Sequence, residues 1–242
     1  MSADPVNTRR ATRVFLLGPG LVLIVAGLAC PGCDRPPPAA AQSGPQAAAA
    51  AGQTLRRLID LRAQRQYTAM PPLIVPACGH QVVGTLAAVD EFLDANHRLC
   101  DWVRDHVGVG LAQTVDQSYL GDNLGVFSRH VELLDAAVVD DQATVSFTVD
   151  SRLPARTARL RRFGDAWRYD PEGGYSDDLP TAFRDMARGL DNVRIELERA
   201  VIPVAELRST PERLVTRVKT ALHRGVALLS KARAAGTAPA VP

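Results

Sequence analysis

The amino-acid sequence predicts an α+β domain in which helices are segregated from an antiparallel sheet. Apolar residues recur at helical spacing over 54–70 and 82–107, alternate with polar residues over 131–169, and return to helical spacing over 179–229. Asp-Asp and Gly-Asp pairs divide the alternating stretch, as hairpin turns do. Helices, a strand meander and further helices in that order indicate this fold class, with a helical extension at the C-terminus.

The chain begins with a segment typical of export signals. Arg9, Arg10 and Arg13 precede an apolar run at 14–29 that stops at Cys30. As a helix this run would reach roughly 24 Å, which is short of a hydrocarbon core of about 30 Å. A Gly-Pro-Gly sequence inside it weakens such a helix further, because proline removes a helix hydrogen bond. We therefore expect residues 1–29 to be a signal peptide.

The end of that run, Gly27-Leu28-Ala29-Cys30, resembles the bacterial lipoprotein signal, in which small residues precede a cysteine that becomes diacylated. The resemblance implies that Cys30 is lipidated and forms the N-terminus of a protein anchored in a membrane of the cell envelope. Such a protein faces the periplasm or the exterior. An uncleaved membrane anchor and plain secretion are the alternatives.

Composition divides the remaining chain. Residues 30–51 are dominated by proline, alanine and glutamine without apolar periodicity, so we expect a disordered tether there. Residues 236–242 are expected to be a disordered tail. Between them we expect an α+β domain at 52–175 and a C-terminal helical hairpin at 176–235 packed on it.

The charge balance argues against nucleic acid as a partner. The whole chain has 28 basic and 26 acidic residues, and residues 1–29 contain three of the arginines and one of the aspartates. Without that segment the chain carries 25 of each. It therefore lacks the basic excess that binding to a phosphate backbone requires.

The elements follow in order from these patterns. A short helix is expected from Thr54 to the proline pair near residue 70, and a long helix from 82 to 107, where Gly108 ends it. Four strands are expected at 131–139, 143–149, 157–163 and 166–169. Two amphipathic helices are expected at 179–197 and 211–233, the second with Thr210 as its N-cap.

The last hairpin reads Arg161-Arg162-Phe163-Gly164-Asp165-Ala166-Trp167. With the order of a short helix, a long helix and a meander, it resembles the nuclear transport factor 2-like superfamily over about residues 53–172. The resemblance implies a cone-like domain in which a curved sheet wraps around the long helix, with a pocket between them. Members use that pocket for binding, for dimerisation or occasionally for catalysis.

No disulfide and no metal site is expected from the cysteines. If the long helix is continuous from Val82, Cys100 lies roughly 27 Å along its axis, whereas bridged Cα atoms lie within about 7 Å. Cys78 therefore cannot reach Cys100. The same separation prevents Cys78 and His80 from sharing a zinc ion with His97 and Cys100.

Strong catalytic spacings are absent: we find no nucleophile elbow, no zinc-protease motif, no phosphate loop and no calcium loop, and we expect no cofactor. Asp135 falls in phase with the apolar residues Val131 and Leu133, and His130 precedes that strand. Either residue is a weak candidate for a general base, with Tyr169 as hydrogen-bond donor. The interpretation we favour is that Asp135 is a strand-end residue reaching water.

Two pairs of residues are candidates for ligand contacts. Trp167 and Tyr169 share one face of the last predicted strand, where they would line an apolar pocket. Arg159 and Arg161 belong to a group of arginines along the second hairpin, which would attract an anionic headgroup or wall polymer. Alternatively, these charges protect a sheet edge.

These observations favour a membrane-tethered envelope protein that binds a small apolar ligand or another envelope protein and catalyses no reaction. Two alternatives remain open. One is an isomerase- or hydrolase-type enzyme that uses the same pocket. The other is an architectural lipoprotein that docks proteins through its C-terminal helices.

Overall fold

The computed structural model describes residues 44–122, 124–171 and 175–234. The chain divides into two units, 1–41 and 42–242, and every residue described here belongs to the second. The predicted signal peptide and the predicted lipid site at Cys30 lie outside the described residues. The second unit confirms the α+β prediction: it combines a curved antiparallel sheet with C-terminal helices.

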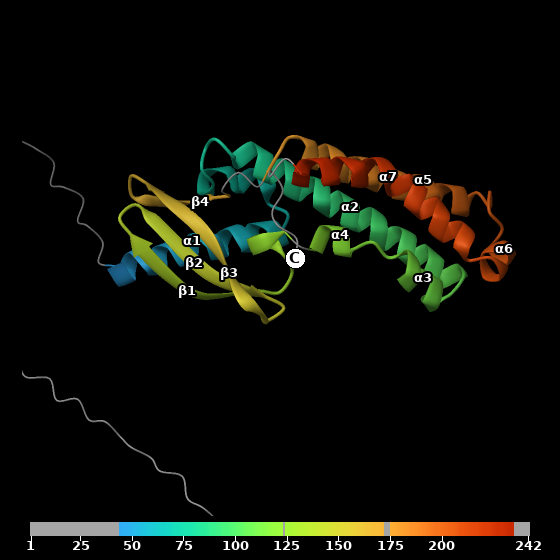
Figure 1. Cartoon of the computed structure of the whole chain (residues 1–242), viewed down its shortest axis with the longest axis horizontal. Coiled ribbons are helices and arrows are strands. Elements are labelled where there is room, and N and C mark those ends of the chain that lie inside the picture. Colours follow the sequence, from blue (N-terminus) through green and yellow to red (C-terminus); the bar gives the residue numbers. More distant parts are fainter. Residues whose placement is uncertain (1–43, 123, 172–174, 235–242) are drawn as a thin grey trace, which may run out of the picture. The chain divides into compact units, whose positions relative to one another are not determined.

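The four strands form one antiparallel meander in the order β1-β2-β3-β4 (Figure 1). They are β1 (Val131–Val139), β2 (Gln142–Val149), β3 (Arg152–Phe163) and β4 (Ala166–Asp170). Alternation places one set of side chains on the core face. The core-face residues that are buried in β2, β3 and β4 are Ala143, Val145, Phe147, Ala158, Leu160, Trp167 and Tyr169.

Helix α1 (Gly44–Ala63) covers the core face of the sheet and contacts β1, β2 and β4 (Figure 1). It begins within the segment 30–51 that composition predicted to be a tether. The reason is the alanine run at 47–51: alanine has the highest helix propensity, and Ala47 and Ala51 are buried. The resemblance stated above implies a sheet wrapped around the long helix, whereas here the shorter helix lies on the sheet.

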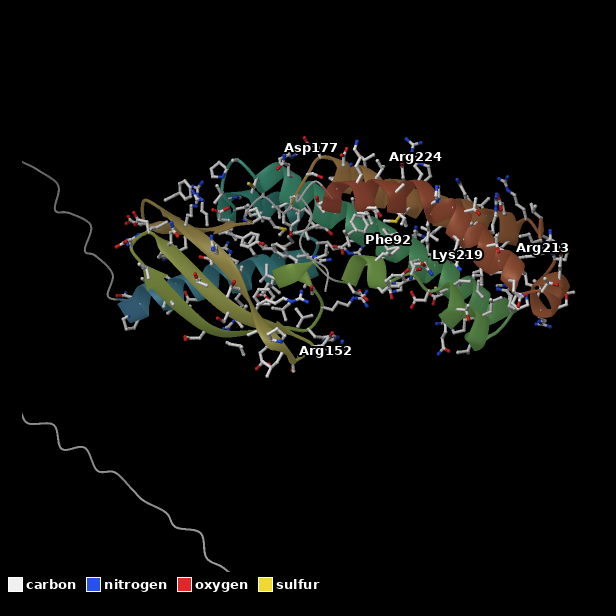
Figure 2. All side chains as sticks on the ribbon, viewed as in Figure 1. Phe92, Arg152, Asp177, Arg213, Lys219 and Arg224 are labelled. Carbon is white, nitrogen blue, oxygen red and sulfur yellow. The ribbon has the colours of Figure 1, made fainter. Side chains whose placement is uncertain are left out.

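Helix α2 (Gly79–His106) is the predicted long helix, and it packs along α5 (Asp178–Glu198), which in turn packs on α7 (Glu212–Ala234). Phe92 of α2, labelled in Figure 2, and Phe183 of α5 meet with ring centroids 5.8 Å apart. We call these three helices the bundle. Among the described residues, no helix is long and apolar enough to cross a membrane.

Short elements connect these parts and were not predicted. They are η1 (Tyr67–Ala69), η2 (Pro71–Leu73), α3 (Val109–Val115), α4 (Tyr119–Asp122), η3 (Gly125–Phe127) and α6 (Val204–Ser209). After η2 the chain lies beside β4, where the Val75 N–H donates to the Tyr169 carbonyl at 2.9 Å. At the end of α2, Gly108 adopts a φ of 149°, a conformation that favours glycine, and the chain turns into α3.

Candidate functional site

A cavity of about 510 Å³ opens where α1, α2, α4 and the start of β1 meet. Its volume lies within the usual range of small-molecule sites, roughly 300–1,000 Å³. The apolar part of its wall consists of Ile59, Ala63, Leu93, Phe127 and Val131. The polar part is contributed by Arg62, Arg65, Asp90, Asp94, His97, Asp122, Ser128, Arg129 and His130. Both kinds of surface face the same space, so the site suits an amphipathic molecule.

Two ion pairs between α1 and α2 stabilise one side of this cavity. Arg62 Nη2 lies 3.0 Å from Asp90 Oδ1, and both side chains are mostly buried. The hydroxyl of Tyr67 donates to the other oxygen of Asp90. Burial and the hydrogen bond to Asp90 raise the pKa of Tyr67. Both oxygens of Asp90 are therefore occupied by donors from the protein itself.

The second pair is bidentate. Arg65 donates from Nη1 and Nη2 to the two oxygens of Asp94, at 2.6 and 2.7 Å. The hydrogen bond from Arg65 holds the pKa of Asp94 below its usual range. Arg65 has a φ of 56° just after α1, where the Gln66 N–H donates back to the Leu61 carbonyl. Glycine is common at such a helix end. The arginine found here instead places its guanidinium group against the Asp94 carboxylate.

Three further basic or imidazole side chains, His97, Arg129 and His130, line the cavity. Within the described residues, the rings of His97 and His130 accept or donate no hydrogen bond, and Arg129 Nε approaches Asp122 Oδ1 at 3.6 Å. His130 has a φ of 53°, a left-handed conformation that non-glycine residues seldom adopt. Such conformations gather at binding sites, where the surrounding structure stabilises them.

The structure places one of the three weak catalytic candidates, His130, at this cavity and separates the other two. Asp135 is exposed, and its carboxylate accepts the N–H of Ala136. A bulge between Leu133 and Asp135 shifts the alternation, so Asp135 does not share the apolar face as its spacing predicted. Tyr169 is buried on β4, at the opposite edge of the four-stranded sheet and out of register with Asp135.

The four candidate ligand contacts do not form one site. Trp167 and Tyr169 belong to the core and line none of the described cavities, although the ring of Tyr169 meets Phe127 edge-on with centroids 5.5 Å apart. Arg159 and Arg161 alternate with buried residues and so face away from the core. Arg161 Nε lies 2.5 Å from Asp170 Oδ2, which identifies it as one half of a cross-strand pair.

Both described cysteines have free thiols, and α2 runs unbroken between them. Cys100 is half-buried on α2, and burial raises the pKa of its thiol to about 11. A thiol with so high a pKa is a poor nucleophile and a poor metal ligand at neutral pH. Among the described residues, no group of three or more histidine, cysteine or acidic side chains is arranged to hold a metal ion.

A second cavity of about 780 Å³ lies between α3, α6 and the first half of α7. Val107, Leu111 and Val215 contribute apolar surface, while Arg208 and Lys219 flank it. Figure 2 marks Lys219 and, nearer the start of α7, Arg213. The inward stripe of α7 itself is buried against the bundle.

Sequence reasoning missed the ion-paired residues of the first cavity. A partial pattern exists: Asp90 and Asp94 lie four apart on α2 and so share a helix face, whereas Arg62 lies on α1 and Arg65 just beyond its end. That pattern shows which side chains share a face but not which helix faces which. The assignment of these residues therefore depends on the tertiary structure.

Comparison with known proteins adds no relative: no protein-family model, no curated protein and no solved structure matches this chain. The candidate site therefore depends on its geometry.

Proposed function

We propose that this chain is a membrane-tethered protein of the bacterial cell envelope, held through Cys30, whose α+β domain binds a ligand without catalysing a reaction. The ligand site is the cavity between α1, α2 and the start of β1. The C-terminal helices serve as its support.

The proposal depends mainly on one observation: two of the carboxylates that line the cavity are ion-paired with arginines. Asp90 and Asp94 both accept hydrogen bonds from arginines, and the pKa of Asp94 is lowered. A general base works best when its pKa lies near the working pH, which these contacts oppose. The same contacts hold two helices at a defined separation, which suits a preformed binding site.

The rival reading is an enzyme of the isomerase or hydrolase type that uses Asp135 and Tyr169. These residues lie on the two edge strands of the sheet, one exposed and one buried. We expect Asp135→Asn to leave both folding stability and ligand retention unchanged, because the side chain touches neither the core nor the cavity. Loss of a cellular phenotype by a stable, ligand-retaining Asp135→Asn protein would support the enzyme instead.

Mass spectrometry of protein purified from its native membrane tests the proposal as a whole. We expect a diacylated N-terminal Cys30 together with a non-covalently retained small molecule. Labelled palmitate should enter the wild-type protein and not Cys30→Ala, which should accumulate as a larger precursor. Equal labelling of both proteins contradicts the anchor, and a ligand-free wild-type spectrum contradicts the binding function.

The cavity between α3 and α7 favours a second candidate, protein docking through the helical end. Its apolar wall and flanking cations would accept an amphipathic segment. Val215→Asp should abolish capture of such a partner while leaving retention of a small molecule unchanged. Retention lost together with capture would show that the substitution disturbs the fold.

A further inference from the structure

We propose that the cavity between α1, α2 and β1 binds a small amphiphile with an anionic headgroup, a carboxylate or a phosphate, which Arg129, His130 and His97 receive at its mouth. This inference rests on the proposed binding function and adds the chemical class of the ligand.

The argument begins with the polar groups that the protein has not already used. Arg62 and Arg65 are paired with Asp90 and Asp94, so their positive charges are already balanced within the protein. The remaining donors are two imidazole rings and the guanidinium of Arg129, which is half-exposed and whose Nε lies 3.6 Å from Asp122 Oδ1. Guanidinium donates and never accepts, and imidazole donates in every protonation state. The open capacity of the site is therefore mainly donor capacity, which an anion satisfies.

The three donors reach the cavity from two separate parts of the chain. His97 belongs to α2, whereas Arg129 and His130 belong to the segment that enters β1. The left-handed backbone of His130 holds this segment against the cavity, and the Asp150 N–H donates to the His130 carbonyl at 3.1 Å. An anion at the mouth would thus bridge α2 and the start of the sheet.

The apolar wall specifies the rest of the ligand. Ile59, Leu93, Phe127 and Val131 form a surface next to the donors, and Leu93 and Phe127 are almost fully buried by neighbouring residues. A bare inorganic anion would leave the exposed parts of this wall, at Ile59 and Val131, in contact with water. An attached alkyl chain would cover it, at about a fourfold gain in affinity per buried methylene.

His97 also faces the carboxylates of Asp94 and Asp116, and Arg129 faces that of Asp122. Asp122 can therefore be used to test whether the cavity binds an anion or a cation. Asp122 lines the cavity opposite Arg129, and within the described residues its buried Oδ1 accepts no hydrogen bond. Its negative charge interacts with the Arg129 guanidinium and would compete with an anionic ligand for that group. Neutralising Asp122 should therefore strengthen binding of an anion, whereas it should weaken binding of a cation.

The experiment uses the full chain in nanodiscs of neutral lipid, titrated calorimetrically against empty nanodiscs. The probes are octanoate, octyl phosphate, octanol, octylammonium and inorganic phosphate. We expect at least one of the two anionic amphiphiles to bind ten or more times more tightly than octanol and than inorganic phosphate. The preferred anion distinguishes a carboxylate source from a phosphate or lipid-headgroup source.

Three substitutions sharpen the result. Arg129→Gln should weaken binding of the preferred anion about tenfold and leave octanol unchanged. Asp122→Asn should strengthen anion binding about threefold. Arg57→Gln is the matched control, because Arg57 is an exposed arginine of α1 that does not line the cavity. It should change neither affinity, and the melting temperature of each variant checks its fold.

Tighter binding of octylammonium than of either anion overturns the assignment, as does an equal loss of octanol and anion affinity in Arg129→Gln. Failure of every probe, with a retained molecule still seen by mass spectrometry, rejects the ligand class and keeps the binding function. Failure of every probe with a ligand-free native spectrum rejects both.

Discussion

The bundle and the cavity are two regions built in opposite ways, although α2 borders both. Between α5 and α7 the backbones approach so closely that a methyl group on Gly189 would lie 2.5 Å from the Ala221 carbonyl oxygen. Between α1 and α2, by contrast, charged side chains hold the helices around about 510 Å³ of open space. Close packing maximises dispersion contacts, whereas open polar space forgoes them. The comparison shows that the bundle gains close packing where the cavity does not, and the proposed ligand would occupy that open space.

The largest loss of folding stability is expected from substitution of Trp167, and it tests whether the sheet end has a tightly packed core. Trp167 is almost fully buried on the core face of β4. Trp167→Ala should lower the free energy of unfolding by about 3–5 kcal/mol in chemical denaturation, because it leaves a large void. Trp167→Phe should cost less, since the indole Nε1 has no hydrogen-bond partner among the described residues. A loss below about 1 kcal/mol for alanine would mean that the sheet end has no tight core of its own.

The second largest loss of stability is expected in the bundle, where α5 and α7 pack closely. A Cβ on Gly225 would lie 2.3 Å from Met186 Cγ and 2.7 Å from the Ala182 carbonyl oxygen. Gly225→Ala should therefore destabilise the protein by about 1–3 kcal/mol. Gly52→Ala on α1 is the control, because nothing lies within 4 Å of its added methyl and alanine favours helix by about 0.5–1 kcal/mol. Equal changes in the free energy of unfolding for Gly225→Ala and Gly52→Ala would contradict the proposed difference in packing.

A smaller effect is expected at the cavity. Arg62→Met removes the cation facing Asp90 and leaves Tyr67 as the donor to that carboxylate. We expect a loss of about 1–2 kcal/mol, because a mostly buried charge loses its partner. Arg57→Met, on the exposed side of the same helix, should be neutral by the same denaturation measurement. A neutral Arg62→Met would show that the pair does not hold α1 and α2 together.

The smallest expected effect is a decrease in the free energy of unfolding at acidic pH. Arg65 lowers the pKa of Asp94. Burial would raise the pKa of Asp116, but hydrogen bonds from Ser118 and Asn96 lower it. The folded pKa values lie below the unfolded ones, so the contribution is full above about pH 4 and is lost as the pH falls through the folded values. Denaturation at pH 2–7 should show this decline, and Asp94→Asn should flatten part of it.

Much of the fold could be predicted from local pattern. The expected strand at 131–139 and the long helix near 82–107 occur at Val131–Val139 and Gly79–His106. Periodicity succeeds here because each element buries one face along its whole length. The start of α1 was missed because residues 44–53 carry little apolar pattern beyond alanine, and alanine is common both in linkers and in helices.

The candidate site was largely beyond such reasoning. Arg62 and Asp90 are 28 positions apart, and their contact depends on how α1 and α2 are placed against each other. The bulge beside Leu133 reversed the face of Asp135, and a bulge of one residue has no reliable signature in a single sequence. His130 was found because it stands at a strand boundary, but its neighbours in the cavity come from helices far away in the chain.

By itself, the sequence determined the fold class, the order of the elements and which face of each main element is apolar, because these depend on spacing along the chain. The tertiary structure decided which faces meet: α1 on the sheet, α2 along α5, and a ring of charged side chains around the space left between α1 and α2. Those contacts arise from packing between segments that are distant in sequence, where small shifts in register change every neighbour.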